Sequence, residues 1–582
     1  MKRCFSRHWF WLTAAAMAVT AAAKPAGERV EMTVQLPPFI VERPAGGTTW
    51  RYVEIPRFEV LSTCNELTTG QIVAAFHRAH ELLGLVLPPK FQVAFATPQA
   101  LILFDQKLWP ENERAAMAVL LPEGTATSPT AEVGPLPSAA RRDPLASTKF
   151  TGRSDSAGTR GRTFFSNLML SDVDSNTIFA LAGEGTLDSE RPSLTVPYVS
   201  MLLERRTPAL PAWFCAGFVQ LYQRMEFRSR TATVSLPRRG DTERLLPLAQ
   251  LLRDFPPSEA DSDHWRADVR LFVCWGLDPD GGRAAAFGRF LDQASAAAPT
   301  ETTFRECFGI GFDAAIAQIE EYGRQTLRLR WVLPAERDRL PKDSVLVEAS
   351  SGQIARIKGE WERLEARYVQ WIRPELADQY VALARRTLHK AYDRGDRDPR
   401  LLATLGLLEA ELGEKAAALP FLEESQGGGG ARPRAAYELA RLRYNSLFGR
   451  SRRDDGKFPA AQIEPLLAPL LLAAQQSPPM VAVFHLLAEA ATMAVEPPSP
   501  EVLSALAAGV RLFPTHRDLA EKVATLHRLA GRNDEADALL ALGANRQPYT
   551  PSNVPDGLME LRDQFPKIDL PPEDSATPRP PR

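Results

Sequence analysis

The segment Leu194–Phe218, LTVPYVSMLLERRTPALPAWFCAGF, contains two short apolar stretches separated by prolines. In the first stretch, Val199, Leu202 and Leu203 fall on one helical face. In the second, apolar or small residues again recur at helical spacing, as Leu210, Trp213, Phe214, Gly217, Phe218 and Leu221. Pro197 and Pro211 fit only the first turn of a helix, because proline lacks an amide proton and clashes one turn back. The segment therefore predicts two short helices joined by a Pro-rich elbow, each with a face that needs a core.

The chain before and after this segment predicts an α+β domain over residues 24–330. Alternating apolar and polar residues between Met32 and Val60 predict half-buried strands. A helix follows over 69–86, and 91–95, 100–104, 163–171 and 176–183 are further strand candidates. Three more helical segments are expected over 265–277, 282–294 and 304–325.

A second region, residues 351–547, has the composition of an all-α array. After a Pro-containing linker at 331–350, the sequence becomes rich in Ala and Leu. Small and apolar residues recur at the offsets of a 34-residue helix-turn-helix repeat, and Ala440 stands 34 residues after Gly406. The positions concerned are Leu402, Leu405, Gly406, Gly413, Ala418, Leu422, Ala440, Ala488, Pro514, Ala524, Gly531, Ala536 and Leu540. The region resembles degenerate tetratricopeptide repeats, and an irregular helical bundle is the alternative.

The termini and one internal segment are predicted to lie outside both regions. Residues 1–23 combine three basic residues with the apolar run WFWLTAAAMAVTAA, the pattern of a secretory signal cleaved near Ala23. We therefore expect a periplasmic or secreted protein. A mobile insertion is expected at about 122–162, and a disordered Pro-rich tail at 548–582, because both lack the apolar residues that offset ordering entropy.

Charge and hydropathy exclude two classes of partner. Of the 69 basic residues, 66 remain after the leader, against 71 acidic residues. The sequence also contains no cluster of basic residues of the kind that binds a phosphate backbone. Nucleic acid is therefore not expected as a partner. No segment after the leader offers the roughly 20 apolar residues of a membrane span, so stable membrane insertion is not expected either.

The quoted segment resembles the active-site segment of HExxH zinc peptidases of the gluzincin, or peptidase MA-like, branch. In that family, two histidines at i and i+4 flank a general-base glutamate, and a second glutamate in a Trp-x-x-Glu-Gly context completes the metal site. Here YV and LLERR stand in the first helix, PALPAW forms the elbow and Gly217 follows in the second. With the preceding strands and helix, the resemblance extends over residues 50–325.

The resemblance places the histidine positions at Val196 and Ser200, the general base at Pro197 and the third ligand at Ala216. Valine, proline and alanine have no side-chain donor atom, and a serine hydroxyl is a poor substitute for the His, Cys or carboxylate ligands that zinc prefers. We therefore expect a peptidase-like domain that has lost its metal ligands, with no metal, no cofactor and no catalytic residue.

Several other residues are weaker candidates for chemistry. His77 and His80 lie about one helical turn apart beside Glu81, which suggests a metal pair or, more simply, solvated helix histidines. Cys215 would need a histidine such as His264 to become a nucleophile. Glu204 has the simpler interpretation of an ion pair with Arg205 or a neighbouring loop.

Four cysteines remain after the leader, Cys64, Cys215, Cys274 and Cys307, and they are compatible with one or two disulfides in an oxidising compartment. Cys215 is either a core thiol or a partner of Cys274 or Cys307. The sequence leaves the pairing open.

The sequence thus predicts an exported, non-catalytic protein. Its peptidase-like domain would be coupled to a repeat array that binds a protein or peptide partner, since such arrays present extended recognition surfaces. A hydrolase that uses Cys215, His264 or Glu204, and a structural component of the cell envelope, are the alternatives.

Overall fold

The computed structural model describes residues 49–105, 108, 163–164, 168–182, 192–240, 243–254, 262–372, 374–427, 432–447 and 456–543. The predicted signal sequence, the strands expected before residue 49, the insertion at 122–162 and the tail at 548–582 lie outside these residues.

The N-terminal region is built on a six-stranded sheet with the strand order β11-β1-β2-β3-β6-β5. Its strands are β1 (Arg51–Ile55), β2 (Phe58–Ser62), β3 (Gln99–Asp105), β5 (Leu168–Ser171), β6 (Asn176–Ala182) and β11 (Val347–Glu348). The central strands β2, β3 and β6 are parallel, and the outer pairs are antiparallel. Parallel neighbours need a long crossover, and helix α1 (Glu66–Val86) supplies it between β2 and β3. The predicted helix over 69–86 and the predicted strands at 100–104 and 176–183 are confirmed here.

Both faces of the sheet are covered by helices. On one face, Phe58 and Val60 of β2 pack against α1, with the rings of Phe58 and Phe76 centred 4.8 Å apart. On the other face, Leu61 packs in a cluster with Trp361 of helix α10 (Ser351–Ile372). Every residue of β2 is buried as a result.

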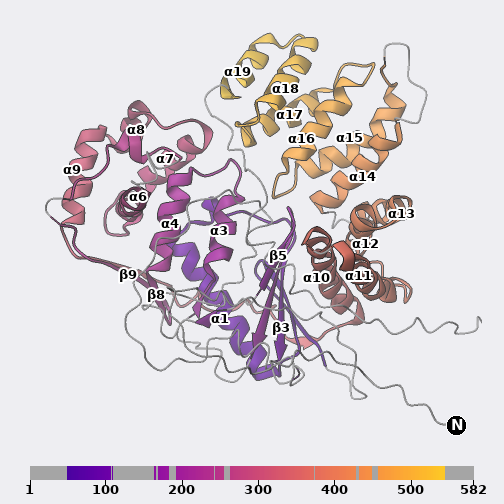
Figure 1. Cartoon of the computed structure of the whole chain (residues 1–582), viewed down its shortest axis with the longest axis horizontal. Coiled ribbons are helices and arrows are strands. Elements are labelled where there is room, and N and C mark those ends of the chain that lie inside the picture. The colour runs from indigo at the N-terminus through magenta and orange to yellow at the C-terminus, as the bar shows by residue number, and fades with distance from the viewer. Residues whose placement is uncertain are drawn as a thin grey trace, which may run out of the picture. The chain divides into compact units, whose positions relative to one another are not determined.

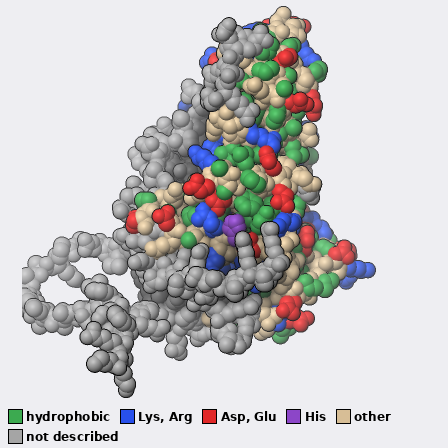
Figure 2. All heavy atoms as spheres, turned by 90° about the vertical axis from the view of Figure 1, so that its right-hand side faces the viewer, with side chains coloured by type: hydrophobic (Ala, Val, Ile, Leu, Met, Phe, Trp, Pro, Cys, Tyr) green, Lys and Arg blue, Asp and Glu red, His purple; other side chains and the backbone are tan. Residues whose placement is uncertain are grey.

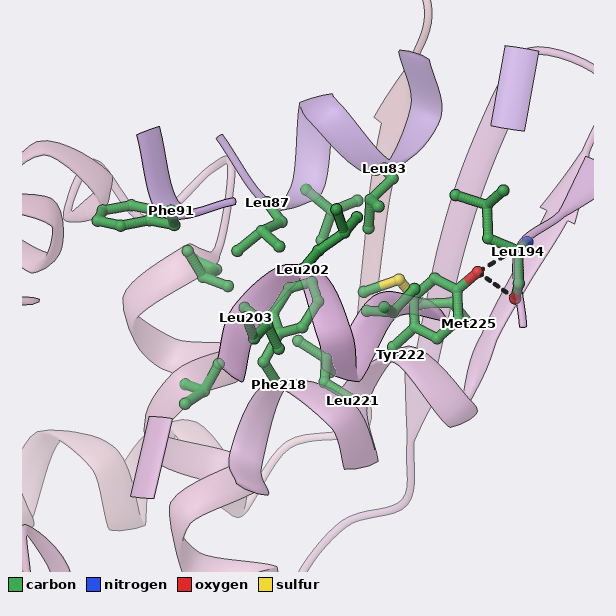
Figure 3. Packing of buried hydrophobic residues seen from close by; sticks show 14 of the residues in the cluster. Leu83, Leu87, Phe91, Leu194, Leu202, Leu203, Phe218, Leu221, Tyr222 and Met225 are labelled. Atoms are coloured by element: carbon green, nitrogen blue, oxygen red, sulfur yellow. Dashed lines mark hydrogen bonds between the residues drawn. The ribbon is translucent and has the colours of Figure 1, made fainter. Parts of the chain in front are cut away.

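A single core joins α1 to the quoted helices and those that follow. Helices α3 (Val196–Glu204) and α4 (Ala212–Gln223) begin as predicted at their prolines. The remaining helices of this part are α5 (Leu248–Leu251), α6 (Ser262–Leu277), α7 (Ala284–Ala296), α8 (Glu301–Phe308) and α9 (Phe312–Gly323). Figure 3 shows Leu83 of α1 and Leu87, the residue after this helix, beside Leu202 of α3, with Phe218 of α4 completing the packing.

Two features of this region differ from the sequence prediction. Residues 91–95 are not a strand; instead the Val93 amide donates to the carbonyl of Leu202 at the end of α3 (2.7 Å). A second, three-stranded antiparallel sheet was not predicted, although its strands alternate between buried and exposed residues: β8 (Met225–Arg228), β9 (Thr231–Leu236) and β10 (Leu327–Val332). A short parallel pair joins β4 (Thr163–Phe164) to β7 (Pro192–Ser193).

The C-terminal region is an array of helices, each packed on the next (Figure 1). They are α10, α11 (Ala377–Tyr392), α12 (Pro399–Leu412), α13 (Lys415–Gln426), α14 (Pro433–Leu447), α15 (Ala460–Ala474), α16 (Val481–Thr492), α17 (Pro500–Leu512), α18 (Arg517–Leu529) and α19 (Asn533–Gly543). One-turn 3-10 helices lie at Pro89–Phe91 and Pro374–Leu376. Within the described residues, no helix combines the length and apolar composition that a bilayer span requires.

The small residues of the predicted repeat lie at helix crossings. A Cβ atom on Gly406 of α12 would stand 2.6 Å from the Leu422 side chain of α13, so only glycine allows this close approach. The corresponding Ala440, Ala488 and Ala524 are completely buried. The protein is therefore an α+β domain followed by an all-α array of the tetratricopeptide type.

Helix α10 belongs to both regions, because its faces meet different neighbours. Ile357, Trp361 and Leu364 face the sheet, whereas Ala355 and Val369 pack with α11 and α12. At Gly359 a Cβ atom would stand 2.4 Å from the Leu388 side chain of α11, which shows how closely these two helices pack.

Replacing Trp361 with alanine should destabilise the protein by about 3 to 5 kcal/mol, because the substitution leaves a cavity between α10 and the sheet. Urea unfolding followed by circular dichroism measures the change. The control is Leu472→Ala, at a side chain on α15 that is 38% exposed, which should change the free energy of unfolding by less than about 0.5 kcal/mol. Equal effects of the two variants would contradict the packing of α10 on the sheet.

Candidate functional site

The positions that correspond to peptidase ligands lie on α3 and α4. Ser200 is buried, whereas Val196, Pro197 and Ala216 are half-buried. Val196 and Ala216 pack at the border of the main core as ordinary apolar side chains. Among the described residues, no three-donor group of His, Cys, Asp and Glu includes a member of α3 or α4. The described residues of α3 and α4 therefore do not offer a divalent ion the ligand set that zinc prefers.

Close contacts hold the two helices in place. The Tyr222 hydroxyl of α4 donates to the Leu194 carbonyl (2.7 Å) and accepts from the Leu194 amide (3.0 Å), which ties the start of α3 to α4 (Figure 3). On the other side of α4, Gly217 lies so close to α6 that a Cβ atom would stand 2.7 Å from the Val269 carbonyl oxygen. These contacts fix the position of α3 and α4 relative to each other and to α6.

The two histidines of α1 are engaged in hydrogen bonds rather than paired for a metal. A ring nitrogen of His77 lies 3.0 Å from the Arg337 carbonyl oxygen. His80 contacts the Phe76 carbonyl and the Tyr198 hydroxyl, both at 3.0 Å, and so links α1 to the first turn of α3. Burial lowers the pKa of His80 to about 3, so its ring is neutral at physiological pH.

Cys215 does not have the surroundings of a nucleophile. Burial raises the pKa of its thiol, and the carboxylates of Glu204 and Asp254 raise it further. The thiol is therefore protonated at neutral pH, whereas the thiolate is the reactive form. The ring nitrogen of His264 that would serve as a base lies 3.1 Å from the Arg244 carbonyl oxygen and 3.2 Å from the Asp268 carboxylate.

All four described cysteines are free thiols, so the structure pairs none of them in a disulfide. The Cys307 thiol donates to the side-chain oxygen of Gln293 (3.2 Å), and the Cys274 sulfur lies 3.6 Å from the Tyr322 hydroxyl. Glu204 is exposed on α3 and interacts electrostatically with Arg205, which agrees with its simpler interpretation.

The largest concentration of buried charge lies elsewhere, along a polar stripe of α10. The stripe lies between the residues of α10 that face the sheet and those that face α11. It consists of four charged residues at helical spacing: Arg356, Glu360, Arg363 and Arg367. Arg363 is fully buried, and its guanidinium contacts Asp172 of the β5–β6 loop (2.7 Å), Glu360 (3.0 Å) and Glu411 of α12 (2.7 Å). One arginine thus joins three segments that are distant in sequence.

The loop between β5 and β6 provides the acidic partners from the α+β domain. Asp172 also accepts from Arg367 (2.8 Å), and Asp174 accepts from the Arg432 guanidinium (2.8 Å) and from the Arg434 amide (3.0 Å). Burial alone would raise the pKa of Asp172, but Arg363 and Arg367 outweigh it and hold that pKa well below its ordinary value. Asp172 is therefore charged in the folded protein at neutral pH.

A second group of ion pairs forms around Glu59 in the middle of the sheet. Arg356 of α10 contacts both carboxylate oxygens of Glu59, and the Arg400 guanidinium of α12 donates to the same side chain (2.8 Å). The Tyr52 hydroxyl adds a hydrogen bond of 2.6 Å. Glu59 is only 2% exposed, so these partners replace the water that a carboxylate would otherwise need.

We did not anticipate these residues from the sequence. The acidic pattern in LSDVDSN and the charged stripe of α10 were both visible, but an amphipathic helix with a charged face normally presents that face to solvent. Strand β2 is buried along its whole length although its sequence contains a glutamate. A buried carboxylate needs a partner, and this was the local signal that an arginine or another donor lies nearby.

Comparison with known proteins adds little to this description. No protein family matches the chain, and no curated protein matches it either. Two solved structures of MamA from AMB-1, in crystal forms P212121 and C2221, are similar at 17% identity and a TM-score of 0.23. They cover 32% and 33% of this chain, and 87% and 96% of their own chains. Scores of this size establish no relationship, and the repeat assignment rests on the helices themselves.

We expect the effect of Glu360→Gln on the free energy of unfolding to depend on pH. Burial would raise the pKa of Glu360, but Arg363 and Arg432 outweigh it and lower the value from 4.5 to about 2. A carboxyl with a lowered folded-state pKa stabilises the fold above pH 4.5, and this contribution is lost as pH falls towards 2. The stability difference between wild type and variant should therefore be on the order of 3 kcal/mol near neutral pH and shrink in acid.

Denaturant unfolding at a series of pH values between neutrality and acid measures this difference. Glu423→Gln is the matched control, because its partner Arg443 lies at the surface and Glu423 is 52% exposed. The control should cost less than about 1 kcal/mol at every pH. A difference between Glu360→Gln and wild type that does not depend on pH would contradict the assigned ion pairs.

Proposed function

We propose that the protein is an exported, non-catalytic interaction scaffold. In this proposal, a gluzincin-like domain without zinc ligands is joined rigidly to a tetratricopeptide-like array, and the array binds a protein or peptide partner. The observation that carries the proposal is the double role of α10, which closes the sheet and also begins the array.

The chemistry of α3 and α4 supports the non-catalytic part. The four ligand and base positions hold Val196, Pro197, Ser200 and Ala216, none of which can replace imidazole or carboxylate in a zinc site. The candidate substitutes are also unfavourable, since Cys215 is a neutral thiol and His264 is held by Asp268. The helices are nevertheless closely packed, which is expected of a domain kept for its shape.

The array supports the binding part. Stacked helix pairs present an extended surface whose usual role is recognition, although this is an inference from architecture. On the face seen in Figure 2, acidic and basic side chains are intermixed with hydrophobic ones. Such a surface suits a folded protein or a peptide of mixed composition better than a polyanion such as nucleic acid.

We expect no peptide hydrolysis by the mature protein in a broad fluorogenic screen, with or without added zinc, because the described residues of α3 and α4 provide neither an activated nucleophile nor the ligand set of a peptidase zinc site. Cys215→Ser and Glu204→Gln should give the same background rate as wild type. Hydrolysis by wild type that either substitution abolishes would overturn the proposal in favour of a hydrolase.

Partner capture should depend on the packing of the array. The bait is the full mature chain, because residues 351–547 alone would expose the sheet-facing side of α10 with Trp361 and its buried charges. Ala440→Arg, at a completely buried position of α14, should disrupt the array and abolish stoichiometric capture from a periplasmic extract.

The control bait is Glu226→Ala, at an exposed position of β8 in the α+β domain, which should capture the partner as wild type does. Capture that survives Ala440→Arg but is lost on substitutions in the α+β domain would contradict binding by the array. Sequencing of the mature N-terminus from a periplasmic fraction tests export, with cleavage expected near Ala23.

A further inference from the structure

Two histidines and an aspartate converge near the end of the array. His485 lies on α16, and His516 and Asp518 lie at the start of α18. One donor atom from each residue lies within 4.8 Å of the other two. The closest contact described between them is 3.7 Å, from Nδ1 of His485 to a carboxylate oxygen of Asp518. Helix α17 separates these residues in sequence, so the fold alone brings them together.

The backbone around this group is held firmly. His485 follows Phe484, which is buried in the core of the last helices. The Phe484 ring is centred 5.8 Å from that of Phe513, which in turn is centred 6.0 Å from the His516 ring. The His516 amide donates to the Phe513 carbonyl (3.0 Å), and the His516 carbonyl accepts from Ala520 (3.1 Å). The two histidine rings are centred 5.8 Å apart.

The donor set and its spacing suit a borderline divalent metal. Zinc binds imidazole nitrogen and carboxylate oxygen at about 2.0 to 2.2 Å, so ligand atoms around one tetrahedral ion lie roughly 3.3 to 3.6 Å apart. The separation of 3.7 Å between His485 and Asp518 is close to that range. Only one carboxylate is present, whereas Mg²⁺ and Ca²⁺ prefer oxygen ligands.

The charge environment is also compatible with a metal. The carboxylate of Asp518 lies beside the imidazole of His485 and would offset part of the charge of a bound divalent ion. Besides Asp518, the titratable groups that act on His485 are His516, Lys522 and Glu489. Glu489 is already a hydrogen-bond acceptor for the Tyr444 hydroxyl (2.9 Å).

We propose that His485, His516 and Asp518 form a binding site for one Zn²⁺ or a similar divalent transition-metal ion, with water as the fourth ligand. The site links α16 to α18 across α17 and stabilises the end of the array. It lies outside α3 and α4 and does not depend on the function proposed for the whole protein.

The test is zinc binding to chelator-treated full-length mature protein, purified without a histidine tag. Isothermal titration calorimetry should show one equivalent bound by wild type, and Mg²⁺ should not compete. His516→Gln should weaken zinc binding at least about tenfold, because it removes a direct ligand. Asp518→Asn, at a side chain 69% exposed, is a second variant that should fold normally and also bind zinc more weakly.

His389→Gln is the matched control, because it removes a histidine of the same array that packs against Phe421 in another helix pair. It should bind zinc as wild type does. Zinc should also raise the melting temperature of wild type and of the control, but not that of His516→Gln. Absence of stoichiometric zinc binding, or equal affinity of wild type, His516→Gln and Asp518→Asn, would overturn the proposal.

Discussion

The structure depends on the buried ion pairs of α10, above all those of Arg363 with Asp172, Glu360 and Glu411. Removing such charges from water is costly, and the cost is offset only when nearly every donor and acceptor finds a partner in good geometry. Arg363 meets this condition because two carboxylates come from the array and one from the β5–β6 loop. Such a network favours one docking arrangement over others, since any shift of α10 would leave buried charges without partners.

The consequence is that the α+β domain and the array behave as one folded unit. Arg432 and Arg434 extend the contact with the β5–β6 loop to the start of α14, and Arg400 extends the contact with Glu59 to α12. Further along the array, the amide of Ala96 donates to the Ser477 carbonyl (2.6 Å). A partner bound to the array would therefore meet a surface whose orientation is set by the domain, not one that swings on a linker.

The helices α3 and α4 form a packed framework in which Val196, Pro197, Ser200 and Ala216 are apolar or hydroxylic residues. Its stability comes from burial of leucine and aromatic side chains and from contacts such as Tyr222 with Leu194. None of these contributions requires a metal.

The sequence by itself determined the local features: the starts of α3 and α4 at their prolines, the central strands and crossover helix of the sheet, the spacing of Gly406 and Ala440, and the lack of His, Cys or carboxylate side chains at Val196, Pro197, Ser200 and Ala216. These follow from periodicity and residue chemistry within a few turns of chain. The tertiary structure alone decided that Asp172 meets Arg363, that Glu59 is neutralised by α10 and α12, and that His485 lies beside His516. Pairing between distant charged or ligating groups depends on how helices pack, and a helix with a charged stripe looks the same in sequence whether that stripe faces water or a second domain.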